Sequence, residues 1–97
     1  MTAYVISEVK FLDRALIEQY RPLAAASIER YGGRYVVRGG PVLCVEGERD
    51  PERSFVVVEF PDMARAKEWY ASPDYAEALK VRRAGALERT LVFVEGV

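Results

Sequence analysis

The segment from Gly32 to Pro41 constrains the fold of this chain more than any other ten residues. Two glycine pairs enclose a short apolar stretch, Arg34-Tyr35-Val36-Val37-Arg38, that carries two arginines. A helical pattern ends just before the first pair, where Gly32-Gly33 supplies the left-handed backbone that terminates a helix. The stretch between the pairs is rich in the β-branched and aromatic residues of strands. The segment therefore predicts a helix, a sharp stop and a strand that places two cations in a sheet.

Apolar runs and alternation predict four strands along the chain. They cover residues 3–10, 34–46, 54–60 and 89–95. Gly39-Gly40-Pro41 interrupts the second strand, and we expect a bulge or bend there. The polar run that follows, residues 47–52, predicts a hairpin loop.

Three N-cap signals predict where the helices begin. Asp13, Asp62 and Ser72 each precede apolar residues at helical spacing, and Pro73 suits the first helical position. Pro22 lies inside the first helical pattern and predicts a kink or a split there. The resulting order, strand–helix–strand–strand–helix–strand, predicts an α+β, ferredoxin-like βαββαβ fold, in which an antiparallel sheet carries its helices on one face.

The strands carry more apolar residues than a sheet covered on one face needs. Val56-Val57-Val58 and Leu91-Val92-Phe93-Val94 place aliphatic or aromatic side chains on both faces, because successive residues of a strand point to opposite sides. Covering ~500 Å² of apolar sheet in each protomer contributes about 12 kcal/mol. Association costs of roughly 4–15 kcal/mol oppose this, but both protomers contribute area. We therefore expect a face-to-face homodimer.

The chain contains no histidine and only one cysteine, Cys44. This excludes Ser-His and Cys-His catalysis, histidine-ligated haem, the usual zinc sites and a disulfide within the chain. We expect no metal and no cofactor, so acid–base chemistry is limited to Asp, Glu, Tyr and Lys. Cys44 has apolar neighbours and is expected to be buried, and a single thiol fits a reducing, cytoplasmic location.

Length and charge further limit the candidate partners. The 97 residues predict a single domain over 1–97, with a formal net charge of −1 and interspersed signs. The only cationic cluster, Lys80, Arg82 and Arg83, fits a helix C-terminus. No apolar run approaches the ~18 residues of a membrane span, and no signal-peptide pattern is present. We therefore expect neither a nucleic-acid nor a membrane partner.

Two arginines and one glutamate are candidate functional residues on the strands. Arg34 and Arg38 are expected to share one strand face, where two guanidinium groups would hold a carboxylate or phosphate. The alternative is that both form ion pairs with carboxylates of the neighbouring strand or of a partner chain. Glu59, at the end of an apolar strand, would act as a general base if burial raised its pKa. An ion pair with Arg38 would instead lower that pKa.

Aromatic side chains suggest a cavity between the helices and the sheet. The candidates are Tyr20, Tyr31, Phe60, Trp69 and Tyr75. An aromatic-lined cavity with a few polar tips is the usual form of a small-ligand site, although aromatic residues at helical spacing also pack as plain core. Arg82 lies seven residues after Tyr75 and would either reach the same cavity or be solvated or paired with a carboxylate.

The motifs together resemble a known family. They are Ala3-Tyr4-Val5-Ile6, Tyr31-Gly32-Gly33-Arg34-Tyr35, Arg38-Gly39-Gly40, Val58-Glu59-Phe60-Pro61, Trp69-Tyr70 and Ser72-Pro73-Asp74-Tyr75. In these the chain is similar to the domain of unknown function 1330 family, short bacterial proteins of the dimeric α+β barrel superfamily. The resemblance implies a ferredoxin-like fold and sheet-to-sheet dimerisation, and it implies no established activity. Relatives in the wider superfamily include cofactor-independent monooxygenases, lactone isomerases, haem enzymes and small-ligand regulators.

Two hypotheses about function follow. In the first, the protein binds or transforms a small aromatic or carboxylated metabolite without a metal. Arg38 then anchors the acid, Glu59 or a tyrosine moves a proton, and Trp69 stacks on the ring. In the second, the protein is a ligand-binding or structural dimer with no chemistry of its own.

Overall fold

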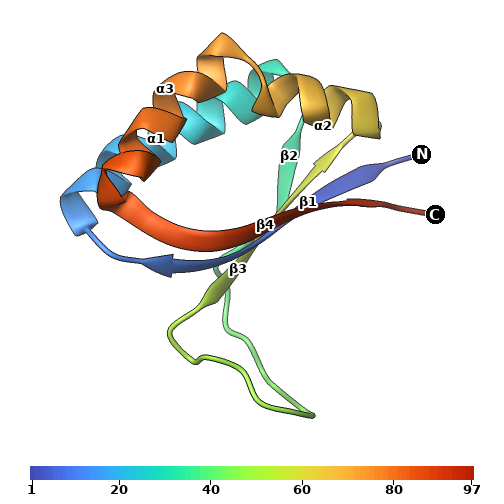
Figure 1. Ribbon diagram of the computed structural model, residues 1–97. Helices are drawn as coiled ribbons and strands as arrows, with labels where there is room; N and C mark the ends of the chain where they lie inside the picture. Colours follow the sequence, from blue (N-terminus) through green and yellow to red (C-terminus); the bar gives the residue numbers. More distant parts are fainter.

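A computed structural model describes residues 1–97 as a four-stranded sheet with helices on one face (Figure 1). The elements are β1 (Ala3–Phe11), α1 (Arg14–Arg30), β2 (Arg34–Arg38), β3 (Ser54–Phe60), α2 (Met63–Tyr70), α3 (Pro73–Val81), a π-helical turn (Arg82–Ala86) and β4 (Leu87–Glu95). The strand order is β2-β3-β1-β4, and every neighbouring pair is antiparallel. The predicted ferredoxin-like α+β fold is confirmed.

The helices begin where the sequence predicts. The side chains of Asp13, Asp62 and Ser72 accept hydrogen bonds from backbone N–H groups three residues later, at 3.0, 2.8 and 3.1 Å. α1 continues through Pro22 as one helix, so the predicted split is wrong. Gly32, at φ +82°, ends the helical segment in the left-handed conformation that glycine adopts without strain. None of these helices is long and apolar enough to cross a membrane.

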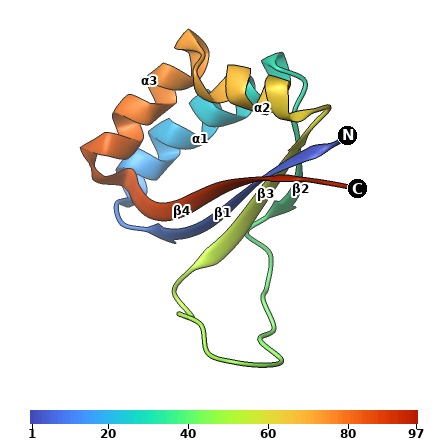
Figure 2. The same cartoon turned by 45° about the vertical axis from the view of Figure 1, so that its right-hand side comes forward.

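The second strand is shorter than predicted. β2 ends at Arg38, not at residue 46, and Gly39 follows with φ +72°. The Gly39 N–H donates to Phe55 O at 2.9 Å, and from residue 40 to residue 53 the chain forms a loop that projects away from the helices (Figure 2). Pro41 has no N–H to donate to a ladder, which favours departure from the sheet. Cys44 lies in this loop and is exposed, so the prediction that it is buried is wrong.

Both faces of the sheet carry apolar side chains, as predicted. On the inner face, Val5, Val58 and Phe60 are buried against the helices. The opposite face, called the outer face below, carries Tyr4, Ile6, Phe55, Val57, Val92 and Val94. The exposed fractions of Val92 and Val94 are 43% and 44%, because no element of the chain covers this face.

Candidate ligand-binding cavity

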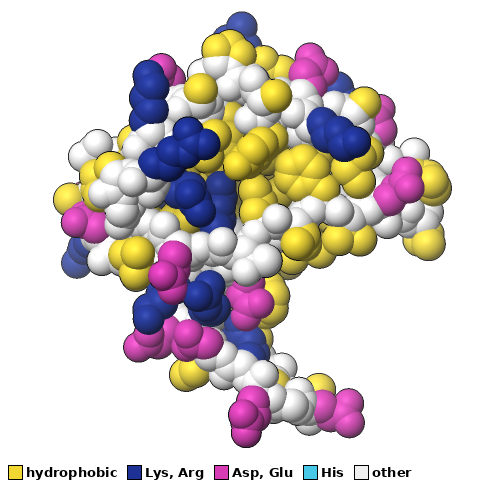
Figure 3. Space-filling model, in the orientation of Figure 1, with side chains coloured by type: hydrophobic (Ala, Val, Ile, Leu, Met, Phe, Trp, Pro, Cys, Tyr) yellow, Lys and Arg dark blue, Asp and Glu magenta, His cyan; other side chains and the backbone are white.

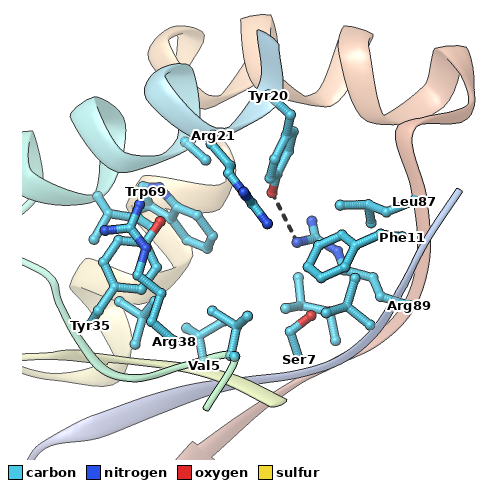
Figure 4. A pocket seen from close by; sticks show the side chains of 17 residues that line it. Val5, Ser7, Phe11, Tyr20, Arg21, Tyr35, Arg38, Trp69, Leu87 and Arg89 are labelled. Carbon is cyan, nitrogen blue, oxygen red and sulfur yellow. Dashed lines mark hydrogen bonds between the residues drawn. The ribbon is translucent and has the colours of Figure 1, made fainter. Parts of the chain in front are cut away.

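A cavity of about 390 Å³ lies between α1 and the inner face of the sheet (Figure 4). It is lined by 17 residues, of which 12 are hydrophobic. Val5 and Val58 come from the central strands, Ala24 and Ile28 from α1, and Trp69 from α2. This volume and this apolar lining fall within the usual range of small-molecule sites.

Three arginines provide the charge of the cavity. Arg21 comes from α1, Arg38 from the end of β2 and Arg89 from β4, and no aspartate or glutamate lines the cavity. None of the three has a carboxylate within 4.0 Å, although nine ion pairs form elsewhere in the chain. Figure 3 shows basic side chains around the hollow beneath the helices and most acidic side chains away from it. The cavity therefore carries positive charge without internal compensation.

Two of these arginines lie against aromatic rings. Arg38 Cζ is 4.2 Å from the centroid of the Tyr35 ring, and Arg21 Cζ is 5.2 Å from that of Phe11. Such cation–π contacts hold the flat face of a guanidinium and leave its N–H edge free to bind an anion. Burial raises the pKa of Tyr35, and the positive charge of Arg38 opposes that rise. The Tyr35 hydroxyl consequently stays neutral beside the arginine.

Tyr20 and Arg89, at one end of the cavity, form a hydrogen-bond network with the buried Tyr75. The hydroxyls of Tyr20 and Tyr75 are 2.7 Å apart. Arg89 donates through Nη1 to Tyr20 at 3.0 Å and through Nη2 to Tyr75. Burial, followed by the proximity of Tyr20, raises the pKa of Tyr75, while Arg89 acts against the rise. Tyr75 is therefore a neutral phenol at physiological pH.

Trp69 is fixed as a wall of the cavity by a hydrogen-bond chain. Its Nε1 donates to Ser27 Oγ at 3.0 Å, and Ser27 Oγ donates to the Ala24 carbonyl at 2.7 Å. The ring centroids of Trp69 and Tyr75 are 4.3 Å apart. With both Trp69 and Ser27 at 2% exposure, this anchor is shielded from water.

The structure separates the candidate residues into two groups. Tyr20, Arg38 and Trp69 line the cavity, and Tyr75 is hydrogen-bonded to Tyr20 without lining it. Of the other candidates, Tyr31, Phe60 and Arg82 are not among the lining residues.

Arg34 and Glu59 lie on the outer face, away from the cavity. The prediction that Arg34 and Arg38 share a face is wrong, because a β-bulge between Tyr35 and Val37 shifts the register of β2 against β3. As a result Arg34 is opposite Glu59, and the two form an ion pair. The prediction of a Glu59–Arg38 ion pair is wrong for the same reason.

Arg21, Tyr35 and Arg89 are among the lining residues that sequence reasoning missed. Arg89 had the clearest signal, since it alternates in phase with Leu87 and Leu91 on the inner face of β4. A cation at an otherwise apolar, inward position indicates either a buried ion pair or a binding site. Arg21 follows Tyr20 on an exposed part of α1 and has no comparable signal.

The similarity to known proteins agrees with this geometry. The family model described as domain of unknown function (DUF1330) matches residues 2–97. The chain belongs to the DUF1330 family. No curated protein matches it significantly.

Solved structures similar to this DUF1330 protein share its fold. A protein of unknown function from Rhodopseudomonas palustris has a TM-score of 0.75 and 22% identity over 99% of this chain and 82% of its own. SnoaB, a cofactor-independent oxygenase from Streptomyces nogalater, has a TM-score of 0.66 and 18% identity over 99% and 93%. A putative antibiotic biosynthesis monooxygenase from Nitrosomonas europaea has a TM-score of 0.56 and 15% identity over 98% and 90%. At these identities the similarity establishes the ferredoxin-like α+β fold alone.

Proposed function

We propose that this protein is a homodimer that binds a small ring-bearing organic anion in the cavity of each protomer, without a metal or cofactor. The observation that supports this most is the presence of three arginines, none paired with a carboxylate, in a cavity with apolar and aromatic walls. A carboxylate about 4 Å from one guanidinium gains roughly 4 kcal/mol at an effective dielectric constant of ~20. Solvent exposure of Arg21 and Arg38 reduces this gain without changing its sign.

The apolar walls of the cavity favour a ring as the uncharged part of the ligand. Trp69 and the aliphatic side chains of the sheet offer a surface on which a ring can pack. The guanidinium groups of Arg21 and Arg38 project into the same space (Figure 4). A ligand with a carboxylate on a ring satisfies both halves of the cavity, which supports an aromatic or other cyclic acid.

The outer face supports dimerisation. Its aliphatic and aromatic side chains, including Val92 and Val94, are partly exposed in a single chain. Solved structures with this fold belong to dimeric α+β barrel proteins. A sheet-to-sheet dimer would cover this face and leave the cavity, on the other side of the sheet, open.

The free thiol of Cys44 is compatible with the cytoplasm as the location.

Measurements of oxygen uptake and of ligand loss distinguish a protein that only binds its ligand from one that also transforms it. SnoaB is a cofactor-independent oxygenase with the same fold, so oxygen consumption is the first activity to measure once a ligand is found. A protein that only binds will show saturable affinity with no loss of ligand and no oxygen uptake. The proposal covers both cases, since the cavity and its cations are the same.

The test uses charge removal at the cavity with a matched control on the same helix. Arg21→Gln and Arg38→Gln each remove one cation from the cavity, whereas Arg14→Gln removes one from an exposed position of α1. Isothermal titration calorimetry with 4-isopropylbenzoate should show affinity about tenfold lower in the two cavity variants. The control should bind like the wild type. Equal binding by all four proteins, or no binding by the wild type, would refute the proposal.

A further inference from the structure

We infer that the Tyr20 hydroxyl donates its hydrogen into the cavity, so that the ligand is a ring-bearing acid with a second oxygen that accepts a hydrogen bond, such as a cyclic or aromatic keto acid. This inference rests on the proposed function for the acid group and extends it to the opposite end of the ligand. The hydrogen-bond donors and acceptors of Tyr20, Tyr75 and Arg89 support it.

Tyr75 determines the direction of the hydrogen bonds. Its hydroxyl has only two partners, the Tyr20 hydroxyl and Arg89 Nη2. A guanidinium group has donors and no acceptor, so Arg89 cannot take the Tyr75 hydrogen. The side chain is fully buried, at 0% exposure, so water is not an alternative acceptor. The Tyr75 hydroxyl must therefore donate to the Tyr20 oxygen.

Tyr20 is consequently left with an unused donor. Its oxygen accepts from Tyr75 at 2.7 Å and from Arg89 Nη1 at 3.0 Å, which uses both of its lone pairs. Its own hydrogen has no acceptor among the protein groups within hydrogen-bond distance. Tyr20 lines the cavity, whereas Tyr75 does not. The free hydrogen is thus available to a ligand in the cavity.

The opposite arrangement leaves a buried donor unsatisfied. If Tyr20 donated to Tyr75, the Tyr75 hydrogen would have no acceptor in a dry environment, which is unfavourable. The raised pKa of Tyr75, caused chiefly by burial, keeps that hydrogen in place at physiological pH. The network therefore behaves as a fixed donor and not as an adaptable pair.

The positions of the side chains indicate where on the ligand the hydrogen-bond acceptor lies. Figure 4 shows Tyr20 and Arg89 at one side of the cavity and Arg38 with Tyr35 at the other. An acid group at Arg38 would direct the far end of a ring toward the Tyr20 hydroxyl. An oxygen acceptor at that end would complete the hydrogen bonding, and a hydrocarbon group there would leave the Tyr20 hydrogen unsatisfied.

The binding experiment compares two acids of similar shape, 4-acetylbenzoate and 4-isopropylbenzoate, by calorimetry. The wild type should bind the acetyl compound more tightly, by on the order of fivefold. Tyr20→Phe should abolish this preference and leave the affinity for 4-isopropylbenzoate almost unchanged. Tyr75→Phe is the matched control, because it removes a donor to Tyr20 and leaves the Tyr20 hydrogen free, so the preference should survive. A preference that persists in Tyr20→Phe would overturn the inference while leaving the proposed function intact.

A ligand-free measurement tests the inference separately from the proposed function. Hydrogen–deuterium exchange of the hydroxyls is read from the Cζ signals of ¹³C-labelled tyrosine, assigned with the two phenylalanine variants. The Tyr20 hydroxyl should exchange quickly with solvent, and the Tyr75 hydroxyl should be protected. Equal protection of the two hydroxyls would overturn the inference, whatever the cavity binds. Failure of both acids to bind, with exchange as expected, would instead overturn the proposed function and the ligand class derived from it.

Discussion

Replacing Ser27 by alanine should loosen the anchor of Trp69, and the structure gives the size of the effect. Ser27 Oγ is the acceptor for Trp69 Nε1, and both residues are almost completely buried. Removing the oxygen leaves the indole N–H without a partner. A buried donor in that condition costs about 1–3 kcal/mol. Because a domain of this size loses roughly 4–8 °C of Tm per kcal/mol, a loss of ~2 kcal/mol lowers Tm by about 8–16 °C.

The assay is urea denaturation followed by far-ultraviolet circular dichroism. Ser27→Ala should lower the midpoint with an unchanged slope, because the surface exposed on unfolding is the same. The control is a double-mutant cycle with Trp69→Phe, in which the indole N–H is absent and Ser27→Ala should cost less than about 0.5 kcal/mol. If Ser27→Ala costs about the same in both backgrounds, or is neutral in the wild type, the Ser27–Trp69 bond does not anchor the cavity wall.

Three further outcomes test the dimer, the outer face and the tyrosine network. The wild type should sediment as a dimer at micromolar concentration and Val92→Asp as an 11.0 kDa monomer, so a monomeric wild type would contradict the proposed dimer. Arg34→Gln combined with Glu59→Gln should leave calorimetric binding of 4-isopropylbenzoate unchanged, because the pair lies on the outer face; a tenfold loss would place it in the site. Burial raises the pKa of Tyr75, so its contribution to stability is complete below pH ~10 and declines above it by about 1.4 kcal/mol per pH unit. Urea midpoints from pH 9 to 11 should therefore fall less steeply in Tyr75→Phe, and identical slopes would contradict the burial of this phenol.

Local chemistry made the helices predictable. Asp13, Asp62 and Ser72 are N-caps whose side-chain bonds lie within three residues of sequence, so no tertiary information was needed. The antiparallel sheet with its helices on one face followed from the order of strands and helices along the chain. The split at Pro22 did not occur because a single missing donor can be tolerated inside a helix that packs against a sheet.

The strand-two region was predicted poorly because its register depends on pairing with β3. A bulge adds one residue, and one residue reverses the face of everything that follows. No side chain in Tyr35-Val36-Val37 marks the bulge, so the face of Arg38 was not readable from the sequence. The apolar residues from 42 to 45 continue the pattern of a strand, yet they follow Gly39 and Pro41 into an exposed loop.

Two aromatic residues of the candidate site were predicted from the sequence, but its cluster of three arginines was not. Tyr20 and Trp69 were readable from their helical spacing, and they do line the cavity. The arginine cluster required knowing that Arg21, Arg38 and Arg89, far apart in the chain, converge on one cavity. Only the completed fold brings three separate elements to that point.

The preference of the cavity for organic anions is tested by comparing an anion with its neutral analogue. Calorimetric titration of the wild type with 4-isopropylbenzoate and with 4-isopropylbenzamide keeps the ring and changes only the charge. We expect the carboxylate to bind about tenfold more tightly, and added salt to reduce this difference. Equal affinities, or tighter binding of the amide, would contradict the claim that three unpaired arginines make this cavity a site for organic anions.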